Sequence, residues 1–104
     1  MFKEIDIYLI KELAALPSTY SRGEDYFRQG RVRGFFADKN CIQAEVRGTR
    51  SYHVKIEDYG DYFSTACNCP AANHYGGLCK HMVAVLLTFL AQVKEQTWDF
   101  GMLC

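Results

Sequence analysis

The chain has 104 residues, a formal net charge of zero and 49% hydrophobic residues, which allow one small domain with a modest core. The neutral total excludes a globally basic nucleic-acid-binding protein, and the longest apolar run, residues 82–91, is too short to cross a bilayer. A domain of this size buries only about 60–70% of its unfolded surface, so a bound metal ion would help to stabilise it.

Cysteine usage and the N-terminus indicate a reducing compartment. The chain has five cysteines, an odd number that suits a disulfide framework poorly. The N-terminus lacks a basic segment followed by an apolar core, so a signal peptide is not expected. We therefore expect a cytoplasmic protein whose thiols are free to bind metal.

An amphipathic helix is predicted over residues 3–16. Apolar side chains recur there at steps of three and four, which places them on one helical face. The members of that face are Ile5, Leu9, Leu13 and Leu16. Pro17 is expected to end this helix, and residues 18–21 are expected to form a connection.

A second, shorter helix is predicted over residues 22–29. Ser21 and Glu24 match the S-x-x-E capping box, in which each side chain bonds a free backbone N–H of the first turn. Gly30 suits the position just after a helix, where the backbone is left-handed.

The hydrophobic period then changes from 3.6 to 2, which predicts strands. The expected strands cover residues 31–37, 41–47, 51–57 and 62–66. Gly34 inside the first strand indicates a bulge, and tight turns separate the others. Four short strands in this arrangement predict an antiparallel meander.

The last helix is predicted over residues 80–96 and is apolar almost all round, so it should be buried across the sheet. The fold class is therefore α+β, with N-terminal helices, a strand meander and a buried C-terminal helix. We divide the chain into residues 1–20, a domain of residues 21–96, and an apolar tail of residues 97–104.

Four metal-ligand residues occur within residues 67–81: Cys67, Cys69, Cys79 and His81. Residues i and i+2 of a strand face the same side, so the first two thiols can converge. Residues i and i+2 of a helix diverge, so Cys79 must lie at or before the helix N-cap, with His81 in the first turn. Three thiolates and one imidazole complete a tetrahedral structural zinc (Zn²⁺) site. His74, in the loop between the pairs, is an alternative ligand.

The Cys-x-Cys and Cys-x-His pairs, followed by an apolar helix, resemble the SWIM-type zinc finger. The upstream pattern at residues 22–32, 44–49 and 52–56 is similar to the N-terminal region of bacterial Swi/Snf-type helicases. The resemblance covers about residues 21–93 and implies zinc ligands at the four residues above. It also implies DNA binding or protein interaction, usually inside a larger protein. The chain contains no G-x-x-x-x-G-K-[ST] motif, so helicase activity is expected to lie outside it.

Two binding functions compete. Residues 22–55 hold eight basic and four acidic side chains, which favours contacts with nucleic-acid phosphates beside stacking aromatics. The candidate contacts are Arg31, Arg33, Arg47, Arg50, Tyr75 and Lys80. The neutral total and the apolar tail favour instead a protein-docking module, for example against an ATPase domain. We do not expect an enzyme or a small-molecule substrate, because saturated zinc leaves no reactive position. A membrane protein is not expected either, because the longest apolar run is too short.

Zinc removal is expected to unfold at least residues 67–81. Structural zinc contributes roughly 10–16 kcal/mol in small fingers, compared with a total domain stability of about 5–15 kcal/mol. The sheet and the two upstream helices could survive the loss.

Overall fold

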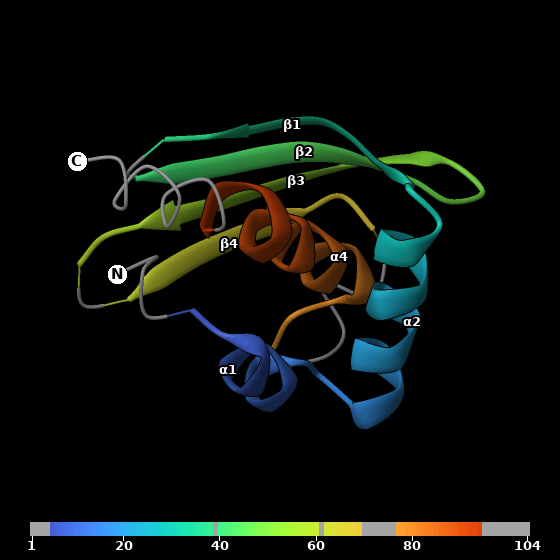
Figure 1. The fold of residues 1–104 in the computed structure, drawn as a ribbon, viewed down its shortest axis with the longest axis horizontal. Helices are drawn as coiled ribbons and strands as arrows, with labels where there is room; N and C mark the ends of the chain where they lie inside the picture. Colours follow the sequence, from blue (N-terminus) through green and yellow to red (C-terminus); the bar gives the residue numbers. More distant parts are fainter. Residues whose placement is uncertain (1–4, 39, 61, 70–76, 95–104) are drawn as a thin grey trace.

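In the computed structural model, which describes residues 5–38, 40–60, 62–69 and 77–94, three α-helices cover one face of a four-stranded antiparallel sheet (Figure 1). The strand order is β1-β2-β3-β4, so each strand pairs with its neighbour in sequence. The α+β meander expected from the sequence is confirmed. The predicted tail, His74 and Tyr75 lie outside the described residues.

The strands are β1 (Val32–Ala37), β2 (Cys41–Arg47), β3 (Ser51–Asp58) and β4 (Phe63–Cys67). The β2 strand has the predicted bounds, and the others differ by one residue at one or both ends. The face toward the helices buries Ile42, Ala44 and Val46 of β2 and Val54 and Ile56 of β3. Period-two alternation alone predicted this face, because successive side chains of a strand point to opposite sides.

Gly34 produces the predicted bulge in β1. Its φ angle is +59°, and the pairing of β1 with β2 shifts register between Arg33 and Phe36. A residue with a Cβ rarely adopts this angle, so glycine permits the extra residue that the bulge inserts.

The first helix, α1 (Ile7–Leu13), is shorter than the predicted range of residues 3–16. It begins after Asp6, whose Oδ1 accepts a hydrogen bond of 2.8 Å from the backbone N–H of Leu9. This cap satisfies one of the free N–H groups of the first turn and so defines the start. Ile10 faces inward and is fully buried.

The second helix, α2 (Pro17–Arg28), corrects two predictions. Pro17 does not end a helix but begins this one, because its missing N–H and preset φ suit the first helical position. The predicted capping box is wrong: Ser21 lies inside α2, and its Oγ donates to the carbonyl of Pro17 at 3.5 Å. The expected division after residue 20 therefore falls within α2.

The C-terminus of α2 follows the prediction for Gly30, which has a φ angle of +70°. Its N–H donates to the carbonyl of Phe27, and the N–H of Arg31 donates to that of Tyr26. These two bonds satisfy carbonyls that the helix leaves free, which is the Schellman arrangement.

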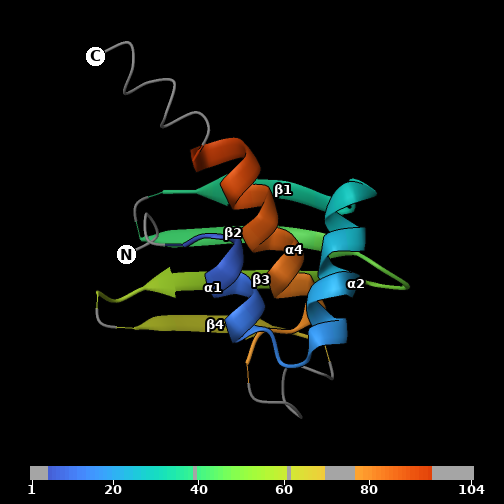
Figure 2. The same cartoon turned by 60° about the horizontal axis from the view of Figure 1, so that its bottom comes forward.

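The last helix, α4 (Lys80–Phe89), crosses the sheet between α1 and α2 (Figure 2). Every residue from 81 to 89 is buried, as the uniformly apolar sequence predicted. A π-helical segment, η2 (Leu90–Lys94), follows in place of regular helix, and residues 95 and 96 lie outside the described range. No helix in the described ranges is long and apolar enough to span a membrane.

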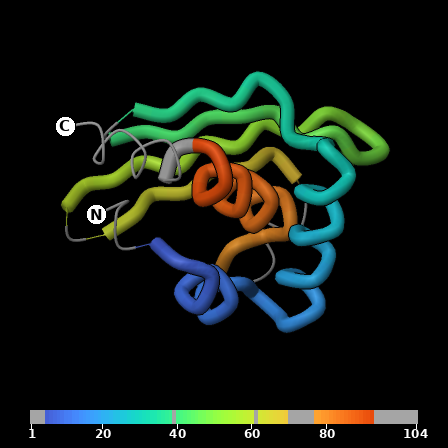
Figure 3. Tube along the Cα trace, viewed as in Figure 1, coloured from blue at the N-terminus to red at the C-terminus, as the bar shows by residue number. Residues whose placement is uncertain are grey.

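The segment leading into α4 lies beside the end of α1, as the trace in Figure 3 shows. Leu78 donates to the carbonyl of Leu13 at 2.9 Å and accepts from the N–H of Ala15 at 3.0 Å. These bonds form a parallel bridge between Ala14 and Leu78. The N-terminal helix is therefore attached to the chain next to Cys79.

Candidate metal centre

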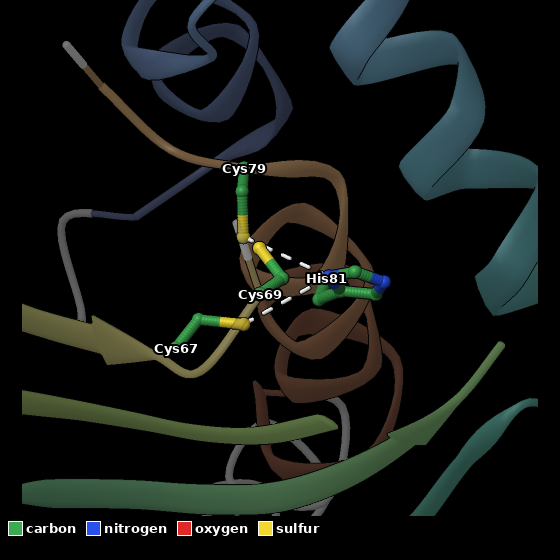
Figure 4. A group of neighbouring side chains, drawn as sticks. All are labelled: Cys67, Cys69, Cys79 and His81. Atoms are coloured by element: carbon green, nitrogen blue, oxygen red, sulfur yellow. Dashed lines mark hydrogen bonds between the residues drawn. The ribbon is translucent and has the colours of Figure 1, made fainter. Parts of the chain in front are cut away.

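The four predicted ligands come from two junctions, the end of β4 and the start of α4, and their side chains point toward one another (Figure 4). Cys67 ends β4 and Cys69 follows it, while Cys79 is the N-cap of α4 and His81 is its second residue. The placement of Cys79 and His81 in the cap and first turn is confirmed. The ligand atoms of the four residues all lie within 4.8 Å of one another.

The distances suit tetrahedral coordination. Nδ1 of His81 lies 3.8 Å from Sγ of Cys67 and 4.0 Å from Sγ of Cys79. Zinc with Zn–S bonds of about 2.3 Å and Zn–N bonds of about 2.0 Å would hold such atoms roughly 3.5–3.8 Å apart. The cluster can therefore hold a metal ion with small adjustments, through Nδ1 of the histidine. Three sulfurs and one imidazole are a donor set that suits zinc.

His81 is held in place by aromatic rings from two different elements. Its ring stacks on Tyr52 of β3 at a centroid distance of 4.1 Å and on Tyr26 of α2 at 5.5 Å. The residue is only 2% exposed, and its Nε2 has no hydrogen-bond partner among the described residues. The other ring nitrogen, Nδ1, faces the sulfurs and could bind a metal ion.

Residues 52–90 match the family model of the SWIM zinc finger. This segment is similar to SWIM zinc fingers. It runs from β3 through β4 and α4, and it contains all four residues of the cluster. Searches among curated proteins and solved structures found no match.

The finger has supporting residues that the sequence did not reveal as such. Asn68, between the first two cysteines, accepts a 2.8 Å hydrogen bond from the backbone N–H of His53 through Oδ1. This bond holds the end of β4 against β3, next to the first two cysteines of the cluster. The only indication of this bond in the sequence was a polar side chain between two ligand residues. Nothing local indicated that Tyr26 would contact His81, because 55 positions separate them in the chain.

Hydrogen bonding between two sulfurs separates the pKa values of their thiols. The bond to Cys79, together with burial, raises the pKa of Cys67 far above its usual range. The same bond lowers the pKa of Cys79 to about 4, and hydrogen bonds from His81 and the backbone N–H of Met82 act in the same direction. In the metal-free folded finger, one thiolate is therefore stabilised by a neighbouring thiol.

Zinc binding near pH 7 should release at least one proton. In the folded metal-free cluster Cys79 is already a thiolate, whereas Cys67 keeps its proton until zinc displaces it. If the metal-free chain is unfolded, the number of protons released approaches three, because free thiols have a pKa of about 8.5 and are protonated near pH 7. Zinc affinity should thus fall as pH falls, by about tenfold per pH unit for each proton released. Calorimetric zinc titrations in two buffers of different ionisation enthalpy measure this number, and a value of zero would contradict the cluster.

The structure divides the predicted nucleic-acid contacts into two groups. Arg31 and Lys80 both lie over the ring of Tyr26, each at 5.5 Å from its centroid. Arg33 and Arg47 belong to β1 and β2, on the sheet face that points away from the helices. Arg50 lies in the turn after β2, and all five assignments stay predictions.

Proposed function

We propose that this protein is a recognition module in which a structural zinc ion supports a surface that binds nucleic acid, with DNA as the expected form. One observation carries the proposal. The ring of Tyr26 stacks on the ring of His81, and the cations of Arg31 and Lys80 lie near the same Tyr26 ring. Positive charge and an aromatic ring are thus coupled directly to a residue of the metal cluster.

The zinc is proposed to be structural. Cys67, Cys69, Cys79 and His81 would occupy all four corners of a tetrahedron, which leaves no position for water or substrate. When bound, zinc supplies charge and cross-linking between the end of β4 and the start of α4. Saturated coordination also makes the thiolates poor nucleophiles, so the proposed role is recognition and not catalysis.

Nucleic acid is favoured because its backbone attracts unpaired cations and its bases stack on aromatic rings. Arg31 and Lys80 form no ion pair within residues 5–38, 40–60, 62–69 and 77–94. Their charges are therefore available to phosphates. The resemblance of residues 22–56 to helicase-associated sequences supports a place in or beside a larger helicase-type protein. The cysteines in the described ranges form no disulfide, which fits a reducing cytoplasm.

The zinc-loaded protein should bind DNA in a salt-dependent way. Fluorescence anisotropy measures this dependence with labelled single- and double-stranded oligonucleotides. The salt concentration is varied from about 25 to about 200 mM, a range in which counterion release changes affinity strongly. We expect affinity to fall with a log–log slope of about −0.7 to −0.9 for each phosphate contacted. Absence of binding to both forms at the lowest salt would overturn the proposed function.

A protein-docking module is the second candidate, and α1 favours it. Four large apolar side chains on or next to this helix are exposed: Ile7, Tyr8, Leu13 and Leu16. An apolar cavity of ≈ 270 Å³ also opens between α1, α4 and the β4 side of the sheet. A Tyr8→Ser variant that binds DNA normally but no longer co-elutes with a helicase-type ATPase domain would assign docking to this helix.

A further inference from the structure

We infer that a hollow between α2 and the first residue of α4 binds the phosphate groups of a nucleic-acid backbone. This inference rests on the proposed function and assigns the contact surface within it. The hollow has a volume of ≈ 330 Å³. Its lining consists of Arg22, Asp25, Tyr26, Gln29, Arg31 and Lys80. Arg22 was not among the contacts that the sequence predicted.

The hollow carries excess positive charge. Three of its side chains are cations and one, Asp25, is a carboxylate, so the formal charge is +2. Within the part of the chain that the structure describes, no carboxylate forms an ion pair with Arg22, Arg31 or Lys80. Unpaired cations gathered at one concave surface attract a phosphate more strongly than the same charges spread apart.

Two of the three cations are held in place before any ligand arrives. Arg31 donates from Nε to Oε1 of Gln29 at 2.6 Å and from Nη1 to the carbonyl of Arg47 at 3.1 Å. Its guanidinium and the Nζ of Lys80 both approach the ring of Tyr26. Side chains that are already ordered lose less entropy when a phosphate binds, which favours this site over mobile surface cations.

The outward face of the sheet is a weaker candidate. Arg47 pairs with Glu45 at 3.6 Å, and Lys55 pairs with Glu57 at 3.8 Å. Arg33 lies opposite Glu45 in the β1–β2 register. Carboxylates thus accompany each of these cations, and a phosphate approaching this face would be repelled as well as attracted.

A second hollow of ≈ 270 Å³ adjoins the first and shares Arg22 and Lys80 with it. Ser18 and Thr19 also line it, and their hydroxyl groups can donate to phosphate oxygens. The two hollows therefore form a continuous surface beside α2. Such a surface suits a strand with successive phosphates better than a single small anion.

The test measures DNA binding by anisotropy against salt for the zinc-loaded variants Arg22→Gln and Lys80→Gln. Each should lower affinity about tenfold near 0.1 M salt and reduce the log–log salt slope by about 1, while zinc content and circular dichroism stay unchanged. Asp25→Asn should raise affinity, because it removes the carboxylate. Arg28→Gln is the matched control: it removes a cation of α2 that is paired with Glu24 at 3.4 Å, outside the hollow.

The outcomes separate this inference from the proposed function. If the wild-type protein binds DNA and Arg22→Gln and Lys80→Gln keep its salt slope, the hollow is not the contact surface, although the function stands. If the wild-type protein does not bind DNA at low salt, both fail. A third arm adds inorganic phosphate, with sulfate at matched ionic strength as control. Displacement of DNA by phosphate but not by sulfate would assign the hollow to free phosphate and overturn the backbone assignment.

Discussion

Removing zinc should unfold the whole domain and not the finger loop alone. Cys69 and Cys79 belong to the buried core, and α4 begins directly after Cys79 and crosses the sheet. Leu78, next to Cys79, is hydrogen-bonded to the end of α1. Loss of the metal would therefore release α4, β4 and α1 together. This expected loss is larger than the one that the sequence indicated, which left open the survival of the sheet and the upstream helices.

The size of the effect follows from typical energies. Structural zinc contributes roughly 10–16 kcal/mol, which is comparable to or larger than a domain stability of about 5–15 kcal/mol. We expect the cooperative thermal transition to disappear after chelation in reducing buffer, and Cys69→Ser to have the same effect. Circular dichroism follows the melt, and mass spectrometry under native conditions confirms that the metal has been removed.

Cys41→Ser is the matched control, because Cys41 is a half-buried free cysteine of β2 outside the cluster. Its sulfur accepts a 3.6 Å hydrogen bond from Nε2 of Gln43. This variant should keep the zinc content and nearly the wild-type melting temperature. A melt that stays unchanged in metal-free protein would contradict structural zinc, and surviving sheet signals after chelation would contradict the global character of the unfolding.

Gly23→Ala should destabilise the domain, although alanine is the better helix former. Gly23 is the buried residue of α2 and faces α4. A Cβ added there would lie 2.4 Å from Cγ1 of Val83 and 2.8 Å from the carbonyl oxygen of Lys80. Overpacking of this kind costs about 1–3 kcal/mol, which exceeds the gain of up to about 1 kcal/mol in helix propensity.

A double-mutant cycle with Val83→Ala tests this contact. The second substitution removes the methyl group that the new Cβ would meet, so the double variant should be less destabilised than the sum of the two. Rescue should be incomplete, because Val83→Ala keeps the Cβ of residue 83, which would lie 2.5 Å from the new Cβ, and because the carbonyl of Lys80 remains. Ser21→Ala, at an exposed position of the same helix, is the control and should be close to neutral. Denaturant unfolding gives the free energies, and a Gly23→Ala variant that is as stable as the wild-type protein would contradict the clash.

The contact of Gly23 with α4 also bears on recognition. It brings α2 against the first turn of α4, where Arg22 and Lys80 line the same hollows. A side chain at position 23 would separate the two helices and the two cations. Gly23→Ala should therefore weaken DNA binding more than its effect on stability alone explains.

Local patterns in the sequence failed where one motif fits two positions in a helix. Ser21 and Glu24 have capping-box spacing, but the same spacing occurs inside α2, and only the position of Pro17 at the first turn decides between them. The shortened α1 has a similar cause, since Asp6 is the residue whose side chain caps it. Helix bounds depend on which of several candidate caps the tertiary packing selects.

The sequence by itself determined the strand alternation, the buried last helix and the position of Cys79 at a helix cap. These features follow from the period of strands and helices, which acts over a few residues. Only the tertiary structure decided that Tyr26 and Tyr52 stack on His81, that Gly23 meets Val83, and that Arg22 shares hollows with Lys80. These contacts join segments that are distant in the chain. Their geometry depends on how α2, α4 and the sheet pack around the metal cluster, which no local period specifies.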